Sequence, residues 1–195
     1  GFGRVVPPMG AYEEYGIEDP RITHINGTYY ITYVAVSQKG IVTALMSTTD
    51  FEHFQRHGVI FAPDNKDVVL FPEKVFGDYL ALHRPMPSIP LSVPQVWLAR
   101  SPDLTHWGGH TQILGGEGSA MGSEKVGGGT VPVRTEKGWL SIYHGSAKAP
   151  DDPGVGVYTA GAMLLDVHDP RRLIGLTPEP IMKPELPFAT TGFVN

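Results

Sequence analysis

Short runs of β-branched and aromatic residues alternate along the chain with tight turns that contain glycine. A turn followed by an aromatic strand occurs three times, in residues 25–33, 75–82 and 135–143, and the turn glycines recur at intervals of 50 and 61 residues. A glycine turn between such runs is typical of a β-hairpin. The pattern therefore predicts three hairpins at equivalent positions of three repeats.

Each predicted hairpin is followed by a further strand and then by a second shared signature around an aspartate. The strand and signature pairs are residues 41–47 with 49–54, 95–101 with 103–107 and, in a looser form, 157–165 with 166–170. A repeat of about 50 residues that holds three or four strands is typical of a β-propeller blade. Glycine and proline leave no uninterrupted helical period of ordinary helix length. We therefore expect an all-β fold, a propeller rather than a sandwich, with about three blades plus edges, short of radial closure.

Length and composition indicate how many domains the chain forms and which classes of partner it lacks. With 195 residues, 41% hydrophobic and 18% charged, the chain is long enough for one domain with a sizeable core. We expect residues 1–195 to form a single propeller domain that lacks closing segments at both ends. No apolar run approaches the roughly 20 residues that span a bilayer, which predicts no membrane partner. The net charge of −5, with dispersed Lys and Arg, argues against nucleic acid.

The absence of cysteine and the spacing of the histidines argue against disulfides, thiolate chemistry and a metal site. The chain has no cysteine, which removes disulfides and thiolate chemistry and favours a reducing compartment, so we expect a cytoplasmic protein. None of the eight histidines pairs with another at ligand spacing beside a carboxylate, which predicts no metal site. Exposed blade edges leave pairing into a homo-oligomer open.

Polar residues gather at the start of each predicted blade, where the inner strands of a propeller point their ends at the central channel. These stretches are residues 18–21 in the first blade, 70–74 and 82–85 in the second, and 124–129 and 143–145 in the third. In the first stretch, Asp19 is a candidate general acid: burial would favour its protonated form, whereas Arg21 would favour the ionised form. The alternative is an Asp-Pro turn with a surface ion pair to Arg21.

The later stretches carry cations suited to an anionic ligand. Arg84 can bind phosphate as a planar fork and Lys125 as a point charge, with His144 and a tyrosine hydroxyl completing the cage. Taken singly, Arg84 is equally consistent with a strand-end ion pair and His144 with a hydrogen-bonded core histidine. Three glycines, residues 127–129, follow Lys125 closely. They either let the backbone approach an anion or relieve crowding near the axis.

Six stretches, taken together, are more specific than any one of them: residues 16–23, 29–33, 65–74, 82–85, 101–108 and 138–145. In this order and spacing they resemble the β-mannoside phosphorylases of glycoside hydrolase family 130, over nearly the whole chain. The resemblance implies a five-bladed propeller with a central active site. It also implies inverting phosphorolysis, in which a β-mannoside oligosaccharide and inorganic phosphate give α-mannose 1-phosphate and a shortened acceptor. Phosphate is then a co-substrate, and no cofactor is expected.

The resemblance assigns roles to particular residues. Asp19 matches the single catalytic acid, which protonates the glycosidic oxygen through a mannose hydroxyl. The matching phosphate-binding set is Arg84, Lys125, His144 and Tyr158, with Lys66 as a weaker candidate. The candidate substrate-binding residues are Glu18, Arg21 and His83. Family members are longer than this chain, so the resemblance also implies that an N-terminal blade and closing strands, with further contacts, are missing here.

Two other functions stay open on the sequence. A β-mannosidase on the same propeller would need a second carboxylate as base, for which Glu73 and Glu124 are candidates, whereas a phosphorylase needs cations there instead. A non-catalytic carbohydrate-binding fragment would use Tyr and Trp side chains to stack on sugar rings.

Overall fold

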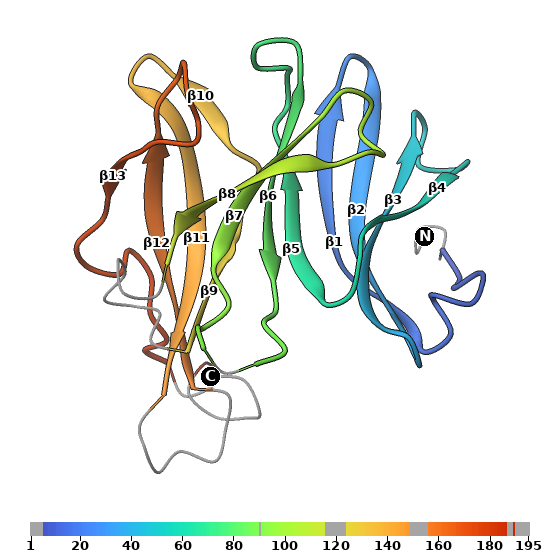
Figure 1. Cartoon of the computed structure of the whole chain (residues 1–195), viewed down its shortest axis with the longest axis horizontal. Helices are drawn as coiled ribbons and strands as arrows, with labels where there is room; N and C mark the ends of the chain where they lie inside the picture. The colour runs from blue at the N-terminus through green and yellow to red at the C-terminus, as the bar shows by residue number, and fades with distance from the viewer. Residues whose placement is uncertain (1–5, 90, 116–123, 149–155, 187–188, 190–195) are drawn as a thin grey trace.

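The structure is a computed structural model that describes residues 6–89, 91–115, 124–148, 156–186 and 189. Its described residues form antiparallel β-strands and contain no α-helix, which confirms the all-β prediction. The strands make three sheets, and the sheet formed by β5–β8 (residues 65–114) lies between the other two (Figure 1). These described ranges accordingly hold no helix with the length and apolarity needed to cross a membrane.

Two of the sheets are meanders in which neighbours in sequence are neighbours in space, and the third departs from this order only at β9. Sheet 1 consists of β1 (Gly16–Ile25), β2 (Thr28–Ser37), β3 (Gly40–Thr48) and β4 (Gln55–Phe61). Sheet 2 consists of β5 (Asn65–Leu70), β6 (Tyr79–Pro85), β7 (Val96–Ser101) and β8 (Gly108–Leu114). Sheet 3 consists of β9 (Lys125–Gly128), β10 (Val133–Thr135), β11 (Gly138–Ala147), β12 (Val157–Leu165) and β13 (Leu173–Leu176). In sheet 3, β9 and β10 pair with different halves of β11, so together they take the place of one inner strand.

The predicted turns lie at equivalent places in the sheets. Asn26 and Gly27 join β1 to β2 with φ of 49° and 83°, and Phe76 and Gly77 precede β6 with φ of 52° and 89°. Positive φ at both central residues is the geometry of a type I′ turn, which matches the twist of antiparallel strands. The turn before β11 contains Gly138, also at positive φ (147°), where an added Cβ would lie 2.2 Å from the Leu165 carbonyl oxygen.

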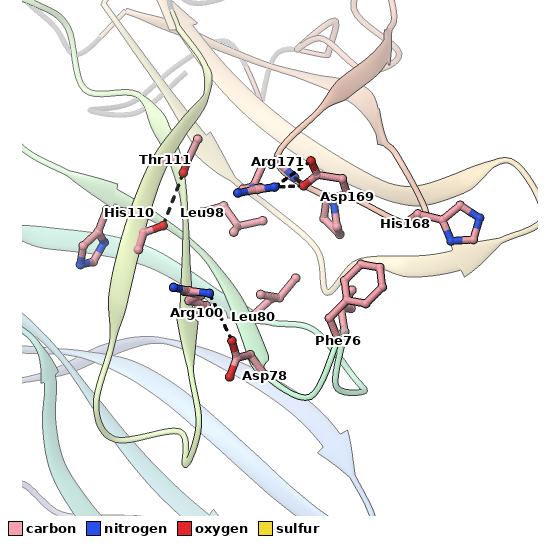
Figure 2. Close-up of a pocket in the computed structure, with 13 residues that line it drawn as sticks. Phe76, Asp78, Leu80, Leu98, Arg100, His110, Thr111, His168, Asp169 and Arg171 are labelled. Atoms are coloured by element: carbon pink, nitrogen blue, oxygen red, sulfur yellow. Dashed lines mark hydrogen bonds and ion pairs between the residues drawn. The ribbon is translucent and has the colours of Figure 1, made fainter.

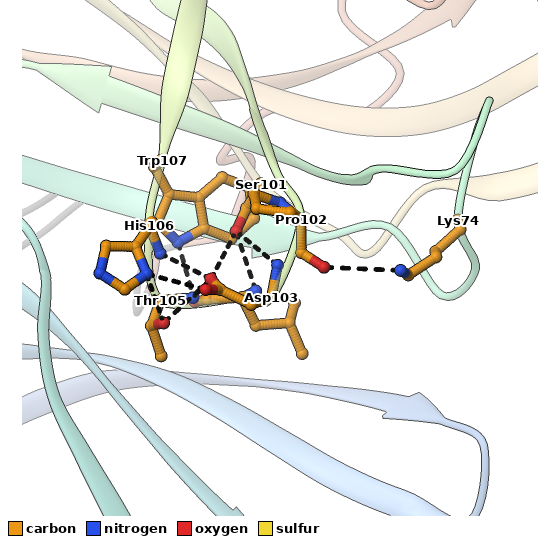
Figure 3. A network of polar contacts seen from close by, with 8 residues as sticks. Lys74, Ser101, Pro102, Asp103, Thr105, His106 and Trp107 are labelled. Carbon is orange, nitrogen blue, oxygen red and sulfur yellow. Dashed lines mark hydrogen bonds and ion pairs between the residues drawn. The ribbon is translucent and has the colours of Figure 1, made fainter.

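The second signature forms the same hydrogen-bonded turn after β3 and after β7. In sheet 2 the Ser101 hydroxyl accepts the Leu104 N–H (2.8 Å), and Asp103 Oδ1 accepts the N–H groups of Thr105 and His106 (both 2.9 Å), as Figure 3 shows. Thr48 and Asp50 make the matching contacts in sheet 1. Backbone and side-chain hydrogen bonds from His106 hold the pKa of Asp103 well below its usual range. The carboxylate therefore stays ionised and keeps the turn closed.

The strands of sheet 2 pack against sheet 1 on one face and against sheet 3 on the other. One core cluster joins sheets 1 and 2 and contains Leu45, Phe61 and Leu70, all almost fully buried. A second joins sheets 2 and 3 and contains Leu82, Trp139 and Tyr143. Sheet 2 is thus covered on both faces, which is why its inner strand β5 is almost continuously buried.

A row of buried threonine hydroxyls also joins sheet 1 to β5. One threonine from each of β1, β2 and β3 donates to a backbone carbonyl of β5. The pairs are Thr23 with Leu70 (3.4 Å), Thr32 with Val68 (2.5 Å) and Thr43 with Asn65 (3.1 Å). These hydroxyls satisfy carbonyl groups on the edge of β5 that has no strand partner.

Candidate active site

The inner strands of sheets 1 and 2 each carry a bulge with an aspartate at its centre. The β1–β2 ladder is interrupted between Glu18 and Arg21, and the β5–β6 ladder between Lys66 and Val69. Asp19 and Asp67 lie within these interruptions with φ of 51° and 56°. Aspartate adopts this left-handed backbone more readily than most residues, and a bulge re-aims the side chain that it carries.

Asp67 binds three cationic or ionisable side chains that come from three different sheets. It is 5% exposed. Arg84 Nε on β6 lies 2.8 Å from Oδ2, Arg21 Nη2 on β1 lies 3.2 Å from Oδ1, and His144 Nε2 on β11 lies 3.4 Å from Oδ2. Since a buried guanidinium without a counterion is strongly unfavourable, Asp67 is what allows Arg84 to be buried.

Arg21 extends this cluster into sheet 3. Its Nη1 donates to the backbone carbonyls of Gly128 (2.8 Å) and Gly129 (2.5 Å) while Nη2 contacts Asp67. A planar guanidinium can make all of these contacts at once because its donors are held in a fixed fork. Arg21 therefore locks the inner strands of the three sheets in one arrangement.

The glycines after Lys125 make room for the cluster. A Cβ on Gly127 would lie 2.1 Å from Asp67 Oδ2 and 2.6 Å from His144 Cε1, closer than any side chain tolerates. A Cβ on Gly129 would lie 2.8 Å from the Ile142 carbonyl oxygen. Of the two interpretations left open by the sequence, crowding is thus the one that the contacts support at these positions.

Lys125 and Tyr158 lie beside His144 at the same end of sheet 3. They occupy the strands on either side of β11, and both pair in register with Ser146. The Lys125 ammonium lies 4.7 Å from the centroid of the Tyr158 ring, and the ring centroids of Tyr158 and His144 are 5.9 Å apart. The structure therefore places His144 beside Arg84 at Asp67 and beside Lys125 and Tyr158 on sheet 3, while the binding of phosphate by these four residues stays a prediction.

The cluster has more positive than negative charge. Burial lowers the pKa of His144 below its usual value; Asp67 opposes this shift, while Arg84, Arg21 and Lys125 add to it. His144 is consequently neutral at pH 7. Arg21 and Arg84 at Asp67, with Lys125 near enough to lower the pKa of His144, then outnumber the single carboxylate of Asp67, and such an arrangement attracts a second anion.

Asp19 lines a groove that adjoins this cluster. The groove, about 380 Å³, is formed by residues 19–22 of β1 with Val69, Gly129 and Val131. Arg21 and Gly129 belong both to the groove and to the contacts around Asp67. Asp19 itself is exposed, and among the described residues no hydrogen bond or ion pair engages its carboxylate. Its carboxyl group is therefore available to a ligand in the groove.

Two further candidates, Lys66 and Glu18, make none of the contacts with Asp67 described above. Lys66 is half-buried and pairs in register with Arg84 across the β5–β6 ladder. Glu18 is exposed and lines a separate, mostly apolar groove on sheet 1 together with Ile17 and Ile22. The roles of Lys66 in phosphate binding and of Glu18 in substrate binding stay predictions.

His83 is buried between sheets 1 and 2, away from the Arg84 side chain. Its ring stacks on Phe61 with centroids 4.6 Å apart, Nδ1 lies 3.1 Å from Asn65 Nδ2, and Nε2 lies 3.1 Å from His110 Nδ1. Burial, with a smaller effect of His110, lowers its pKa to about 3. His83 is a neutral link between the sheets, and its contact with a substrate stays a prediction.

Asp67 is the residue that sequence reasoning missed. It stands within residues 65–74, one of the stretches that carry the family resemblance, but nothing local distinguishes it from a surface aspartate. The available signal was indirect, because buried arginines at blade entrances require a carboxylate partner. In the described part of the chain, no group of three or more His, Cys, Asp or Glu side chains could hold a metal ion.

Comparison with known proteins gives a consistent result. The sequence model of the glycoside hydrolase 130 family, described as β-1,4-mannooligosaccharide phosphorylase, matches residues 3–195. A β-1,2-mannobiose phosphorylase from Listeria innocua is 44% identical over 95% of this chain and 50% of its own length. A 1,2-β-oligomannan phosphorylase from a Thermoanaerobacter species is 39% identical over 92% of this chain and 57% of its own length.

A solved structure agrees with the sequence matches. The structure of β-1,2-mannobiose phosphorylase from Listeria innocua in complex with β-1,2-mannobiose superposes with a TM-score of 0.89 and 42% identity, covering 96% of this chain and 51% of that one. The chain thus spans about half the length of the relatives it matches. The family match over nearly every residue and the identity above 40% lead to one conclusion: this chain belongs to glycoside hydrolase family 130.

Proposed function

We propose that the protein carrying this chain catalyses phosphorolysis of β-mannosides. The observation that carries the proposal is the positively charged cluster of Arg21, Arg84 and Lys125 around a single carboxylate, directly beside the groove of Asp19. A phosphorylase needs a site for an anionic nucleophile and one acid, not two carboxylates across a sugar ring. The named activities of the 44% and 39% identical relatives support the same reaction.

The proposed reaction assigns a role to each group. A phosphate oxygen, held by Arg84, Lys125 and the Tyr158 hydroxyl, forms a bond to the anomeric carbon from the face opposite the leaving group. The bond from that carbon to the glycosidic oxygen breaks, and this oxygen receives a proton that Asp19 supplies through a mannose hydroxyl. The products are α-mannose 1-phosphate and the shortened mannoside. Neutral His144 offers a hydrogen bond to phosphate without adding charge.

Both relatives compared above are named for β-1,2 linkages, so we propose a β-1,2-mannoside as the substrate. The test is to incubate the whole protein with β-1,2-mannobiose or β-1,4-mannobiose, each with and without phosphate. Mannose 1-phosphate should form from the β-1,2-linked substrate only when phosphate is present. Free mannose released at the same rate without phosphate would contradict phosphorolysis and indicate a hydrolase. Faster turnover of the β-1,4-linked disaccharide would contradict the linkage alone.

Two substitutions separate the roles of the anion site and the acid. Arg84→Ala should raise the KM for phosphate at least about tenfold, since a charge-assisted fork is lost. Arg134→Ala is the matched control: it removes an arginine whose ion pair with Glu73 (2.8 Å) is exposed on the surface. Asp19→Asn should lower kcat by at least about 100-fold, as expected on loss of a general acid, while phosphate binding persists.

The hydrolytic alternative has less support from the contacts. Glu73, one of the two candidate bases, forms its ion pair with Arg134 at the surface, and both side chains are about half exposed. Glu124, the other candidate, is exposed as well. Neither takes part in the contacts around Asp67.

We further propose that sheets 1, 2 and 3 are consecutive blades of a five-bladed propeller whose other blades come from the rest of the protein. The proposal is supported by the meander order of β1–β4, β5–β8 and β10–β13 and by the core clusters that join sheet 2 to both neighbours. A crystal structure of the whole protein tests it: sheets arranged as a two-layer sandwich would contradict it.

A further inference from the structure

A second groove lies at the opposite end of β6 from Arg84. It has a volume of about 620 Å³, within the range of roughly 300–1,000 Å³ that small-molecule sites occupy. The buried side chains of Leu80 and Leu98 line it, and polar side chains of sheet 2 face residues 168–171, between β12 and β13 of sheet 3, across the opening (Figure 2). None of the residues around Asp67 takes part in it.

Phe76 lines this groove with an exposed side chain and an unfavourable backbone conformation. Phe76 is 82% exposed, and its backbone has a φ of 52°. Bulky residues rarely adopt positive φ, and type I′ turns prefer Asn-Gly. The equivalent turn of sheet 1 follows that preference, with Asn26 at a φ of 49° followed by Gly27. Turn formation therefore does not account for the phenylalanine, which places an exposed aromatic ring beside the groove.

The charged residues of the groove form two separate ion pairs, one from each sheet. Arg100 Nη1 lies 3.7 Å from Asp78 Oδ2, and Arg171 contacts both Asp169 oxygens at 2.7 and 3.0 Å. Both arginine side chains are about two-thirds exposed, so these pairs add little to stability. Because each guanidinium already has its own carboxylate, the groove does not select an anion. It offers both donors and acceptors to a neutral polar ligand.

The backbone of β8 is shaped to hold Arg100 in this position. Gly109 has a φ of 61°, and a Cβ there would lie 2.7 Å from Arg100 Nε and 3.1 Å from its Cγ. The arginine side chain therefore lies across the glycine. Its guanidinium lies beside Asp78, as Figure 2 shows. An aromatic ring can stack on the apolar face of a pyranose. Carboxylates accept hydrogen bonds from its hydroxyl groups, and a guanidinium donates to them.

We propose that this groove is a second carbohydrate-binding site, which binds a neutral mannooligosaccharide away from the Asp19 groove. Phe76 stacks on one sugar ring, and the Arg100–Asp78 and Arg171–Asp169 pairs hydrogen-bond to hydroxyl groups of the chain. The general class, a neutral sugar chain, rests on the groove itself, whereas the choice of mannose rests on the proposed function.

Phe76→Asn tests the proposal without weakening the fold, because it introduces the residue that the equivalent turn of sheet 1 already uses. The whole protein and the variant are titrated with β-1,2-mannotetraose by calorimetry, and the ring signals of His110 and His168, which both line the groove, are followed by NMR. We expect the two histidine signals to shift in the original protein. In Phe76→Asn we expect affinity at the groove to fall about tenfold, as for loss of one aromatic contact, with an unchanged or higher melting temperature.

Phe51→Asn is the matched control. Phe51 is also exposed (42%) and also has positive φ (58°), but it lies on sheet 1, so binding at the groove should persist. Unshifted histidine signals in the original protein, or equal groove affinity in Phe76→Asn, would overturn the proposal. A change of oligomeric mass in Phe76→Asn without a change in sugar binding would also overturn it and would identify Phe76 as a protein contact.

Failure of the proposed function gives a different result. Phosphorolysis of β-1,2-mannobiose in the original protein is assayed in parallel, and Phe76→Asn should leave its kcat unchanged. If no phosphorolysis occurs but the histidine signals shift with mannotetraose, the proposed function fails while the second site stands. If phosphorolysis occurs and the signals do not shift, only the second site fails.

Discussion

Asp67 determines, at the scale of single residues, where three other side chains point. Arg21, Arg84 and His144 come from different sheets and meet only at its carboxylate. A phosphate bound by Arg84 would therefore meet donors that are already oriented before it arrives, and such preorganisation lowers the cost of binding.

Substituting Asp67→Asn should remove this counterion. Two buried or half-buried guanidiniums then lose their charge partner, and we expect the free energy of unfolding to fall by about 3 kcal/mol, as when one member of a buried pair is removed. The carboxylate also opposes the lowering of the His144 pKa, so that pKa should fall further in the variant. Urea unfolding and an NMR titration of the His144 ring measure the two effects. Glu73→Gln, at an exposed pair, is the control and should change neither; a His144 pKa that rises in Asp67→Asn would contradict the geometry.

At Gly127, the addition of a single methyl group should have a large effect on stability. In Gly127→Ala the new methyl group would meet Asp67 and His144 at 2.1 and 2.6 Å, so the cluster must shift. We expect a loss of roughly 1–3 kcal/mol in stability, typical of overpacking, together with a higher KM for phosphate. Gly108→Ala is the control, since nothing lies within 4 Å of its added Cβ. Equal stability and KM in the two variants would show that the cluster can yield at no cost.

The turn that follows β3 and β7 is the clearest repeated device at the scale of elements. It uses a hydroxyl residue, Thr48 or Ser101, and an aspartate two residues later to accept successive backbone N–H groups. Ser101 is fully buried, and its hydroxyl accepts the hydrogen bond of the Leu104 N–H group in place of water.

Ser101→Ala should accordingly leave the Leu104 N–H buried without an acceptor. Such a group costs about 1–3 kcal/mol, and we expect this loss in the free energy of unfolding from urea titration. Thr49→Ala changes an exposed residue in the corresponding turn of sheet 1 and should stay within about 0.5 kcal/mol of the original protein. If Ser101→Ala were equally neutral, the hydroxyl would not be holding the turn.

Strands and turns were easier to predict from the sequence than side-chain contacts between sheets. Turn glycines and aromatic strands are local signals, so Gly27, Gly77 and Gly138 located the repeats correctly. Arg84 and His144 could be grouped because both stand in the last half of the strand that follows a predicted turn. His83 directly precedes Arg84 on β6, and neighbouring residues on a strand face opposite sides, so the separation of these two side chains could have been foreseen from the sequence. Asp67 depends on a bulge and on partners 46 and 77 residues away, which no local pattern encodes.

The whole molecule should lose stability in acid because of a histidine buried between two sheets. The pKa of His83 is about 3 in the folded protein, against about 6.5 in an unfolded chain. Between these values the unfolded state binds more protons, so stability rises with pH and falls as pH drops below about 6.5, by up to about 1.4 kcal/mol per pH unit.

His83→Gln should flatten that dependence, because glutamine does not titrate. Urea unfolding of both proteins at pH 7, 6 and 5 measures the difference in slope. His144, whose pKa is also lowered, contributes a slope of the same sign that the variant keeps. Parallel slopes in the two proteins would mean that His83 is protonated without opening the contact between sheets 1 and 2.

The threonine row between sheet 1 and β5 has a consequence for how the sheets find their relative position. Apolar faces can slide past one another at little cost, but hydroxyls that must meet the carbonyls of Asn65, Val68 and Leu70 fit in one alignment only. A shift by one residue would leave all three unpaired and carry Arg21 away from Asp67. The docking register of two sheets, and with it the position of Arg21 beside Asp67, is thus set by three buried threonine hydroxyls.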